Sequence, residues 1–516
     1  MRSSKLTKSS SDYALSSLQS RTLQPVEEAS PLSIWPGGWI LYEISTRPWL
    51  YTLTKKYKRP ITKLNDIPDE EFLALKDRGV DMVWMMGVFQ LGAYGLKYDR
   101  TNVNQVNGYR QLLPDYTEQD VIGSPYAIVD YHCNSQLGTD EDLRNFHKRL
   151  NSLGLYLMLD FVPNHTAVDC EWAKTDPNFY VRSPKDSQKP YSDAYHPESG
   201  IAYGSCGWGA WQDTLQLNHW NPELARLRTQ ELCHVASMCD GIRCDMAYLA
   251  LNDLIEQNWG HQLYTWGWKK PATEWWEGAI KAVKQRFPNV VLLAEVYSPW
   301  QELGFDYTYD KQLYDRLSWG HLDYTKDWFI HNSPSFTKRS AHFVSNHDEP
   351  REAIHFGSWW RAAAAALLSF TLPGVRFFWQ GQWEGHQNKL AVHLRRAREE
   401  QPHSEVVAFY DKLLPIISHE IFKKGEWVYL DVWGTDQSWR LMAWRWSYGK
   451  ERRLCVLNFS DYEGTGRVIV SDAEGEGDIP IVELLSGEKY ERPAKEMRQD
   501  GLFVIVPPWY GQIFSY

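Results

Sequence analysis

The sequence predicts a (β/α)8 barrel, a TIM barrel of the α/β class, with an excursion domain after strand 3 and a C-terminal antiparallel β-sandwich. Three observations carry this prediction. Short, continuously apolar segments recur along the first 420 residues, helical patterns lie between them, and short alternating strands replace both patterns after about residue 420. Continuous apolar runs are typical of parallel strands that are covered on both faces. Strand alternating with helix about eight times indicates a closed barrel.

Eight segments are candidate barrel strands, of which 305–310 has the weakest pattern. In chain order they are residues 38–45, 80–89, 153–162, 239–247, 289–297, 305–310, 341–346 and 374–381. Between two of them, residues 140–154 place Leu143, Phe146 and Leu150 on one helical face and end in a glycine. A second helical pattern, "EWWEGAIKAVKQRFP", stops at a proline.

The spacing of these segments predicts how the chain is divided. We assign residues 35–165 and 216–415 to the barrel, 166–215 to an inserted loop-rich domain B, and 420–516 to the sandwich. Residues 1–34 are rich in serine and lack the apolar core of a secretory signal, so we expect a disordered tail, with an organelle transit peptide as the alternative. The seven cysteines form no CxxC pair, which favours a reducing, cytoplasmic location.

Composition excludes several classes of partner. The net charge of -10 and the lack of basic runs argue against a nucleic acid or an anionic membrane surface. The longest apolar stretch is too short to span a membrane. The 26 tryptophans and 29 tyrosines offer flat faces on which sugar rings stack, although packing in a large core is the alternative for most of them. No pattern predicts the oligomeric state.

Polar side chains end four of the predicted strands. They are Asp160, Asn164 and His165 in "LDFVPNH", Arg243 and Asp245 in "GIRCDMA", Glu295 in "LLAEVY", and His347 and Asp348 in "FVSNHDEPR". The active site of such a barrel lies at the carboxyl ends of its strands. One polar strand end is explained by a helix cap or by solvent, but four at one mouth indicate catalysis.

Arg243 and Asp245 differ from Glu295 in their local sequence. Side chains alternate along a strand, so Arg243 and Asp245 point to the same side. We expect the guanidinium to hold the pKa of Asp245 low, as a carboxylate nucleophile requires. Glu295 has only apolar neighbours and no cation in its strand, which favours a neutral acid that protonates a leaving group. A purely structural ion pair between Arg243 and Asp245 is the alternative.

These segments resemble the α-amylase family of glycoside hydrolases. Its motif regions appear here in order as "DFVPNH", "GIRCDMA", "AEV" and "SNHDEP", and the resemblance runs from about Trp35 through the C-terminal module. The resemblance implies that Asp245 is the nucleophile, Glu295 the general acid/base and Asp348 the stabiliser of the transition state. It also implies a retaining mechanism through a covalent glycosyl-enzyme.

The resemblance further implies a set of residues that surround the reacting sugar. In these roles, His165 and His347 hold hydroxyls, Arg243 orients Asp245, Asp160 supports the mouth from behind, and Tyr126 stacks under the sugar. Arg351 resembles the residue found in relatives that act on short α-glucosides. Tyr248 and Leu249 stand where many starch amylases carry Lys-His, which favours an oligosaccharide over a long α-glucan as the substrate.

We expect no cofactor and name no metal ligand. Asn164 matches one calcium ligand of the family, but Ca²⁺ needs six to eight oxygens and the remaining ligands are not evident, so a structural Ca²⁺ is only weakly supported. The sequence therefore predicts a retaining glycoside hydrolase that cleaves α-glucosidic bonds of α-glucans or oligosaccharides. The alternatives are a transglycosylase or isomerase of the same family, a catalytically silent carbohydrate-binding or scaffold homologue, and a metal-dependent barrel hydrolase.

Overall fold

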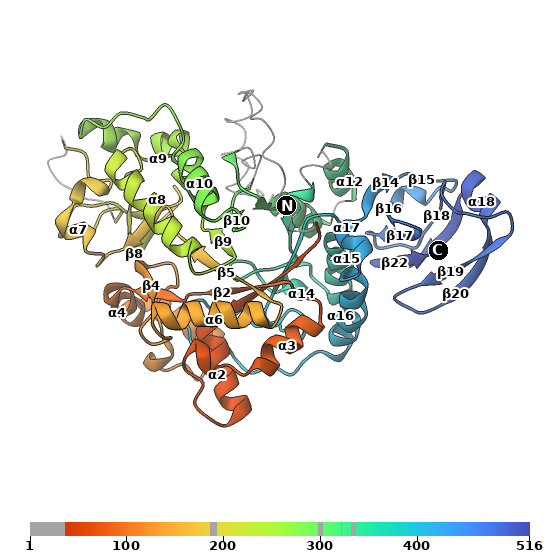
Figure 1. The fold of residues 1–516 in the computed structure, drawn as a ribbon, viewed down its shortest axis with the longest axis horizontal. Coiled ribbons are helices and arrows are strands. Elements are labelled where there is room, and N and C mark those ends of the chain that lie inside the picture. The colour runs from red at the N-terminus through yellow and green to blue at the C-terminus, as the bar shows by residue number, and fades with distance from the viewer. Residues whose placement is uncertain (1–36, 186–192, 298–302, 321, 332–336) are drawn as a thin grey trace, which may run out of the picture.

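The computed structural model describes residues 37–185, 193–297, 303–320, 322–331 and 337–516 (Figure 1). The predicted N-terminal tail, residues 1–34, lies outside the described residues. Within them, no helix is both long enough and apolar enough to cross a membrane.

Eight parallel strands close into a barrel, as the sequence predicts, and each predicted segment contributes one of them. The strands are β1 (Ile40–Ser45), β2 (Met82–Met86), β5 (Tyr156–Phe161), β9 (Gly241–Cys244), β10 (Val291–Ala294), β11 (Tyr307–Tyr309), β12 (Ser340–His342) and β13 (Val375–Trp379). Neighbours in the barrel follow chain order, and β13 pairs back onto β1. The weakest segment, 305–310, contains the short strand β11.

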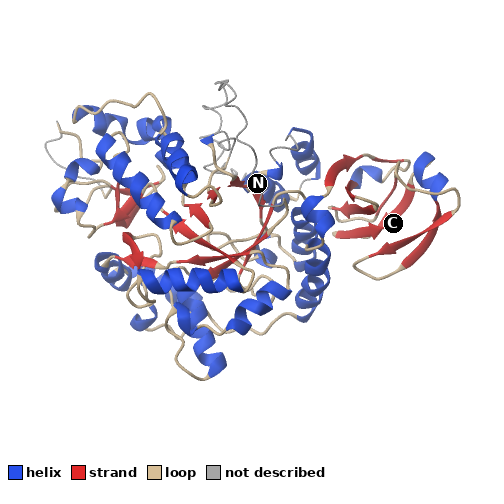
Figure 2. Cartoon of the chain, in the orientation of Figure 1, coloured by secondary structure: helices blue, strands red, loops and turns tan. Residues whose placement is uncertain are grey.

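Helices surround the strands and bury their outer faces (Figure 2). The main ones are α2 (Thr46–Tyr57), α3 (Asp69–Asp77), α6 (Asp140–Ser152), α8 (Pro222–Ala236), α9 (Asn252–Thr265), α10 (Trp275–Arg286), α11 (Lys311–Trp319), α12 (Leu322–His331), α15 (Trp359–Phe370) and α16 (Ser404–Ile417). In α6, the predicted face of Leu143, Phe146 and Leu150 is fully buried. Thr139 caps the start of this helix, and its end is followed by Gly154 in a left-handed conformation.

Two excursions extend from the carboxyl ends of the strands. After β5, the strands β6 (His165–Ala167), β7 (Tyr203–Ser205) and β8 (Ala210–Gln216) form a small antiparallel sheet within the predicted excursion. After β2, the hairpin of β3 (Phe89–Leu91) and β4 (Ile128–Cys133) encloses the helices α4 (Ala93–Thr101) and α5 (Val103–Leu112). The apolar run at 80–89 predicts one strand and no second excursion, but Gly87, at φ 80°, turns the chain between β2 and β3.

The C-terminal module consists of two antiparallel sheets that pack face to face. The six-stranded sheet contains β14 (Glu426–Leu430), β16 (Leu441–Tyr448), β17 (Glu451–Asn458), β22 (Tyr510–Ser515), β19 (Asp478–Glu483) and β20 (Lys489–Pro493), and the three-stranded sheet contains β15 (Val432–Trp433), β18 (Gly464–Val468) and β21 (Leu502–Val506). Leu454 and Val456 of the larger sheet share a core with Val468 and Val504 of the smaller one. This module, blue in Figure 1, lies beside α15 and α16 of the barrel.

Candidate active site

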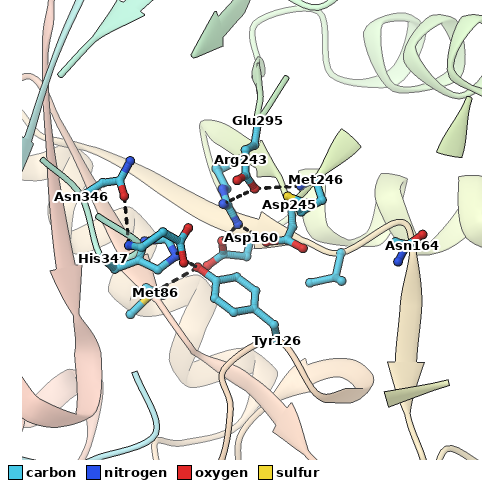
Figure 3. A network of polar contacts seen from close by, with 12 residues as sticks. Met86, Tyr126, Asp160, Asn164, Arg243, Asp245, Met246, Glu295, Asn346 and His347 are labelled. Carbon is cyan, nitrogen blue, oxygen red and sulfur yellow. Dashed lines mark hydrogen bonds and ion pairs between the residues drawn. The ribbon is translucent and has the colours of Figure 1, made fainter. Parts of the chain in front are cut away.

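The barrel brings polar residues that are far apart in the sequence to its carboxyl mouth (Figure 3). Asp160 of β5 pairs in register with Arg243 of β9, and Arg243 pairs with Leu293 of β10, two residues before Glu295. Neighbouring strands therefore deliver neighbouring side chains, and the loop after β12 adds His347 and Asp348.

Arg243 is the centre of this cluster. One nitrogen of its fully buried guanidinium, Nη1, lies 2.5 Å from Asp245 Oδ1 and 3.5 Å from Asp160 Oδ1. The other, Nη2, lies 2.5 Å from Glu295 Oε2. Its Nε donates to the Tyr309 hydroxyl at 3.3 Å. Asp245 and Glu295 are therefore held on the two arms of one guanidinium, within the reach of a single sugar ring.

The charge state of Asp245 differs from the prediction. Burial raises the pKa of Asp245 to about 7, the Arg243 charge lowers it, and the negative charges of Glu295, Asp348 and Asp160 raise it again. The expectation of a low pKa is therefore wrong. The sequence shows the arginine beside Asp245, but it does not show that three carboxylates share that arginine.

The surroundings of Glu295 also differ from the apolar ones that its own strand suggests, because Arg243 reaches it from the neighbouring strand. Its Oε2 accepts hydrogen bonds from Arg243 Nη2 and from the backbone N–H of Met246 at 2.8 Å, and its Oε1 accepts one from the Tyr297 hydroxyl at 2.8 Å. Met246 directly follows the predicted nucleophile and adopts a left-handed conformation, with φ 40° and ψ 43°. Such strain in a residue with a side chain is typical of functional sites.

A second ion cluster surrounds His347. Its Nδ1 lies 2.5 Å from Glu43 Oε1, and its Nε2 lies 3.1 Å from Asp348 Oδ2. Burial on its own lowers the pKa of His347, but the charges of Asp348 and Glu43 outweigh burial and raise it to about 10. Burial on its own raises the pKa of Asp348, but the His347 charge holds it well below its usual range. The His347 charge outweighs burial, because the Asp348 side chain is 56% exposed and loses only part of its hydration.

Glu43 is a member of this site that the sequence analysis missed. It lies in β1 and is fully buried. The signal was present in the segment "GWILYEIS", where an acidic residue interrupts an otherwise apolar strand. A buried carboxylate needs a partner, and here that partner is His347.

Tyr126 lies against the same histidine. Its hydroxyl is 2.7 Å from His347 Nε2 and donates to Met86 Sδ at 3.2 Å, and the two rings stack with centroids 5.4 Å apart. The Arg243 guanidinium lies 5.3 Å from the centre of the tyrosine ring. Tyr126 is partly exposed, so the structure places it at the mouth among the predicted catalytic residues.

Asp160 and His165 are both buried. Asp160 Oδ2 accepts a hydrogen bond from Trp84 Nε1 at 2.9 Å, and burial, opposed by the Arg243 charge, raises the pKa of Asp160 to about 6. His165 packs against Trp211, with ring centroids 5.2 Å apart. Burial lowers the pKa of His165 to about 3, so its ring is neutral and can exchange hydrogen bonds with a sugar hydroxyl.

Arg351 lies beside the cluster and does not join it. Its Nη1 donates to the Gln380 carbonyl at 2.9 Å, its Nε donates to the Asn388 carbonyl at 3.3 Å, and its guanidinium stacks on Trp379 at 3.5 Å. These contacts hold the loop after β13. The next loop residue, Lys389, donates to the backbone carbonyl of Asp348.

Asn164 stands apart from the polar cluster in Figure 3. Its Oδ1 accepts a hydrogen bond from Gln216 Nε2 at 2.8 Å, and Gln216 Oε1 in turn accepts one from the Ser205 backbone N–H. Asn164 therefore offers one amide oxygen, whereas Ca²⁺ takes six to eight oxygen ligands.

Comparisons with known proteins point to one family. The family model described as the alpha amylase catalytic domain matches residues 70–408. Among curated proteins, Alpha-amylase 3 of Dictyoglomus thermophilum is 23% identical over 288 residues, which is 50% of this chain and 53% of that protein. An alpha-glucosidase of Culex pipiens is 24% identical over 370 residues, which is 60% of this chain and 56% of that protein. The chain thus spans about half the length of these curated relatives.

Solved structures share the fold over almost the whole chain. A maltogenic alpha-amylase from Thermotoga neapolitana superposes with a TM-score of 0.67 at 21% identity, covering 93% of this chain and 98% of that one. An alpha-amylase from Geobacillus thermoleovorans superposes with a TM-score of 0.64 at 17% identity, covering 93% of this chain and 98% of that one. At such identities, the likeness shows that the barrel and the C-terminal module are arranged as in those proteins.

Proposed function

Since the chain belongs to the α-amylase family, we propose that it is a retaining glycoside hydrolase that cleaves α-glucosidic bonds through a covalent glycosyl-enzyme. One observation carries this proposal. Asp245 and Glu295 meet on the two arms of the Arg243 guanidinium, each 2.5 Å from it. A retaining enzyme needs two carboxyl groups about 5–5.5 Å apart, close enough for one to attack the sugar and the other to protonate the leaving group.

The proposed reaction is a double displacement. Asp245 attacks the anomeric carbon, the glycosidic bond breaks, and Glu295 gives its proton to the departing oxygen. Glu295 then takes a proton from water, whose oxygen attacks the same carbon and releases Asp245. Asp348, kept ionised by His347, stabilises the positive charge that develops on the sugar.

The reaction requires the proton on Glu295 and the negative charge on Asp245. Burial raises the pKa of Asp245 to about 7, and the Arg243 charge opposes that rise and favours the ionised nucleophile.

The acceptor side of the site favours a short oligosaccharide. Tyr248 and Tyr297 lie with their ring centroids 5.6 Å apart, and the Tyr297 hydroxyl contacts Glu295. Two aromatic rings thus lie beside the proposed acid/base, and one of them, Tyr248, stands at the first of the two positions where many starch amylases carry Lys-His. Aromatic faces pack against sugar rings, which also favours a second candidate function, transfer of the glycosyl group to an acceptor sugar in place of water.

The experiment compares the wild-type protein with Asp245→Asn on 4-nitrophenyl α-glucoside, maltotriose and soluble starch. We expect turnover of the two short substrates that exceeds turnover of starch, and a loss of about 10⁴-fold or more in kcat in the variant. Proton NMR of the first product should show the α-anomer, and longer products at high maltotriose would reveal transfer.

Three results would contradict parts of this proposal. The β-anomer as first product excludes retention, and turnover that Asp245→Asn leaves intact excludes the assigned nucleophile. No turnover by a correctly folded wild-type protein favours a silent homologue. A metal-dependent hydrolase would lose its activity with a chelator, and we expect no such loss.

A further inference from the structure

A cluster of metal-ligating side chains lies outside the proposed active site. His132 is near the end of β4, Asp140 is the first residue of α6, and His234 is in the last turn of α8. Their ligand atoms all lie within 4.8 Å of one another, and no other such group occurs in the part of the chain that the structure describes. Three separate elements therefore converge on one point.

The distances suit a transition-metal ion. His132 Nδ1 lies 2.7 Å from Asp140 Oδ2, and His234 Nε2 lies 3.8 Å from the same oxygen. Ligands in a tetrahedral zinc site, with bonds of about 2.0–2.2 Å, are separated by roughly 3.4 Å. The two separations lie on either side of that value, so the three groups are close enough to share one ion.

The groups behind the ligands already orient them. Asp140 Oδ1 accepts the backbone N–H of Cys133 at 2.8 Å, which turns Oδ2 toward the two imidazoles. His234 Nε2 is buried and has no hydrogen-bond partner among the described residues. The Tyr131 backbone also hydrogen-bonds the His234 ring. Ligating histidines are typically oriented by such a backbone partner.

We propose that His132, Asp140 and His234 bind a divalent transition-metal ion of the Zn²⁺ type. Two imidazoles and one carboxylate suit this class, whereas Ca²⁺ and Mg²⁺ prefer oxygen ligands alone. The His132 side chain is 68% exposed, so water has access to the remaining coordination position. A bound ion links β4 to α6 and α8, and β4 begins two residues after Tyr126, so the ion also fastens the hairpin that carries this residue.

The test titrates the full-length protein, freed of metals with a chelator, with ZnCl2 in a calorimeter and with CoCl2 in a spectrophotometer. We expect one saturable site per chain, visible absorption bands from coordinated Co²⁺, and a higher melting temperature with Zn²⁺. Loss of a group that hydrogen-bonds a ligand weakens metal sites about 10–100-fold, so loss of a ligand itself in His132→Ala or His234→Ala should weaken zinc binding more than about 100-fold.

A matched control is available on the same helix. His147 lies in α6 and pairs with Asp240 Oδ2 at 2.8 Å, away from the cluster, so His147→Ala should leave the zinc affinity within about twofold. His132→Ala removes an exposed side chain, so its fold should be retained. Zinc binding that both ligand variants keep, or no saturable binding at millimolar ZnCl2, would overturn the proposal and leave only a surface His–Asp hydrogen bond at a helix start.

Discussion

Arg243 shows how one residue sets the chemistry of the proposed site. Its guanidinium is fully buried and contacts Asp160, Asp245 and Glu295, so a single positive charge faces three carboxylates. The planar fork of arginine presents several donors in fixed directions, which is what allows two carboxyl groups to be held in defined positions at once.

We therefore predict that Arg243→Lys lowers kcat by at least about 100-fold, since a lysine nitrogen reaches one of the two carboxyl groups and leaves the other misplaced. KM should change much less, because Arg243 lies behind the carboxylates. Steady-state kinetics on 4-nitrophenyl α-glucoside measures both values.

Arg376→Lys is the matched control for this prediction. Arg376 is also a fully buried arginine of the barrel, but it donates to the backbone carbonyls of Phe370 at 2.6 Å and Phe422 at 2.8 Å. Its replacement should lower the melting temperature without a comparable loss of kcat. Equal losses of kcat in both variants would show that Arg243 acts only through stability.

At the residue scale, the sequence predicts which carboxylates lie at the barrel mouth but not how their charges shift one another's pKa values. Asp245, Glu295 and Asp348 were found because each follows an apolar strand. The low pKa expected for Asp245 was wrong, since it was inferred from Arg243 alone. Carboxylates from β5 and β10 share that arginine, and only the closure of the barrel brings them to it.

At the scale of elements, β1 supplies a charge that a distant loop needs. Glu43 and His347 are separated by 304 positions, and the pairing of β1 with β13 closes the barrel that brings them together. In the folded protein the pKa of His347 is about 10, whereas the ordinary pKa of histidine is 6.5. At pH values between these two, the folded state therefore binds more protons than the unfolded state.

This difference predicts how stability depends on pH. The contribution of His347 is complete below about pH 6.5 and is lost as the pH rises toward about 10, so the melting temperature should fall across that window. Glu43→Gln removes one of the two anions that raise the pKa of His347 in the folded state, so the fall should be smaller and should end at lower pH. Scanning fluorimetry from pH 6 to 10 measures both curves.

Glu483→Gln serves as the control for this pH effect. Glu483 is also buried, but its oxygens accept from the backbone N–H groups of Leu485 at 3.1 Å and Ile513 at 3.0 Å. Its loss should lower the melting temperature by a similar amount at every pH. If the Glu43→Gln curve ran parallel to that of the wild type, the assigned charge on His347 would be wrong.

Element prediction succeeded where the pattern was local. The helix at residues 140–152 was predicted from three apolar side chains and a glycine, and all three side chains are buried. The excursion after β2 was missed because Gly87 lies inside a continuous apolar run, "VDMVWMMGVF". A left-handed turn at a glycine does not interrupt a run of apolar residues, so the one predicted strand contains parts of two strands, β2 and β3.

At the scale of the whole molecule, the C-terminal module shares a core with the barrel. Trp446 of β16 is 2% exposed, and its Nε1 donates to the carbonyl of Thr371, just after α15, at 2.7 Å. Its ring packs against Phe422 at a centroid distance of 5.5 Å, and it belongs to the same buried cluster as the barrel strands. Because this interface is apolar and buried, we expect the barrel and the C-terminal module to unfold together.

Trp446→Ala tests this coupling, because it removes a large buried side chain and its hydrogen bond at the junction. We expect the free energy of unfolding to fall by about 3–5 kcal/mol, as for other buried aromatic truncations. Trp433→Ala in the same module is the control, since Trp433 is 46% exposed and should change stability by less than about 0.5 kcal/mol.

Urea unfolding followed by both fluorescence and glycosidase activity gives the midpoints. The barrel carries the proposed active site, and six of the 26 tryptophans lie in the module, so a separate unfolding of the module would appear as its own step in fluorescence. Coincident midpoints in both variants mean one cooperative unit. If fluorescence reported an early transition in Trp446→Ala while activity survived to the wild-type midpoint, the module would be an independent domain that the barrel does not need.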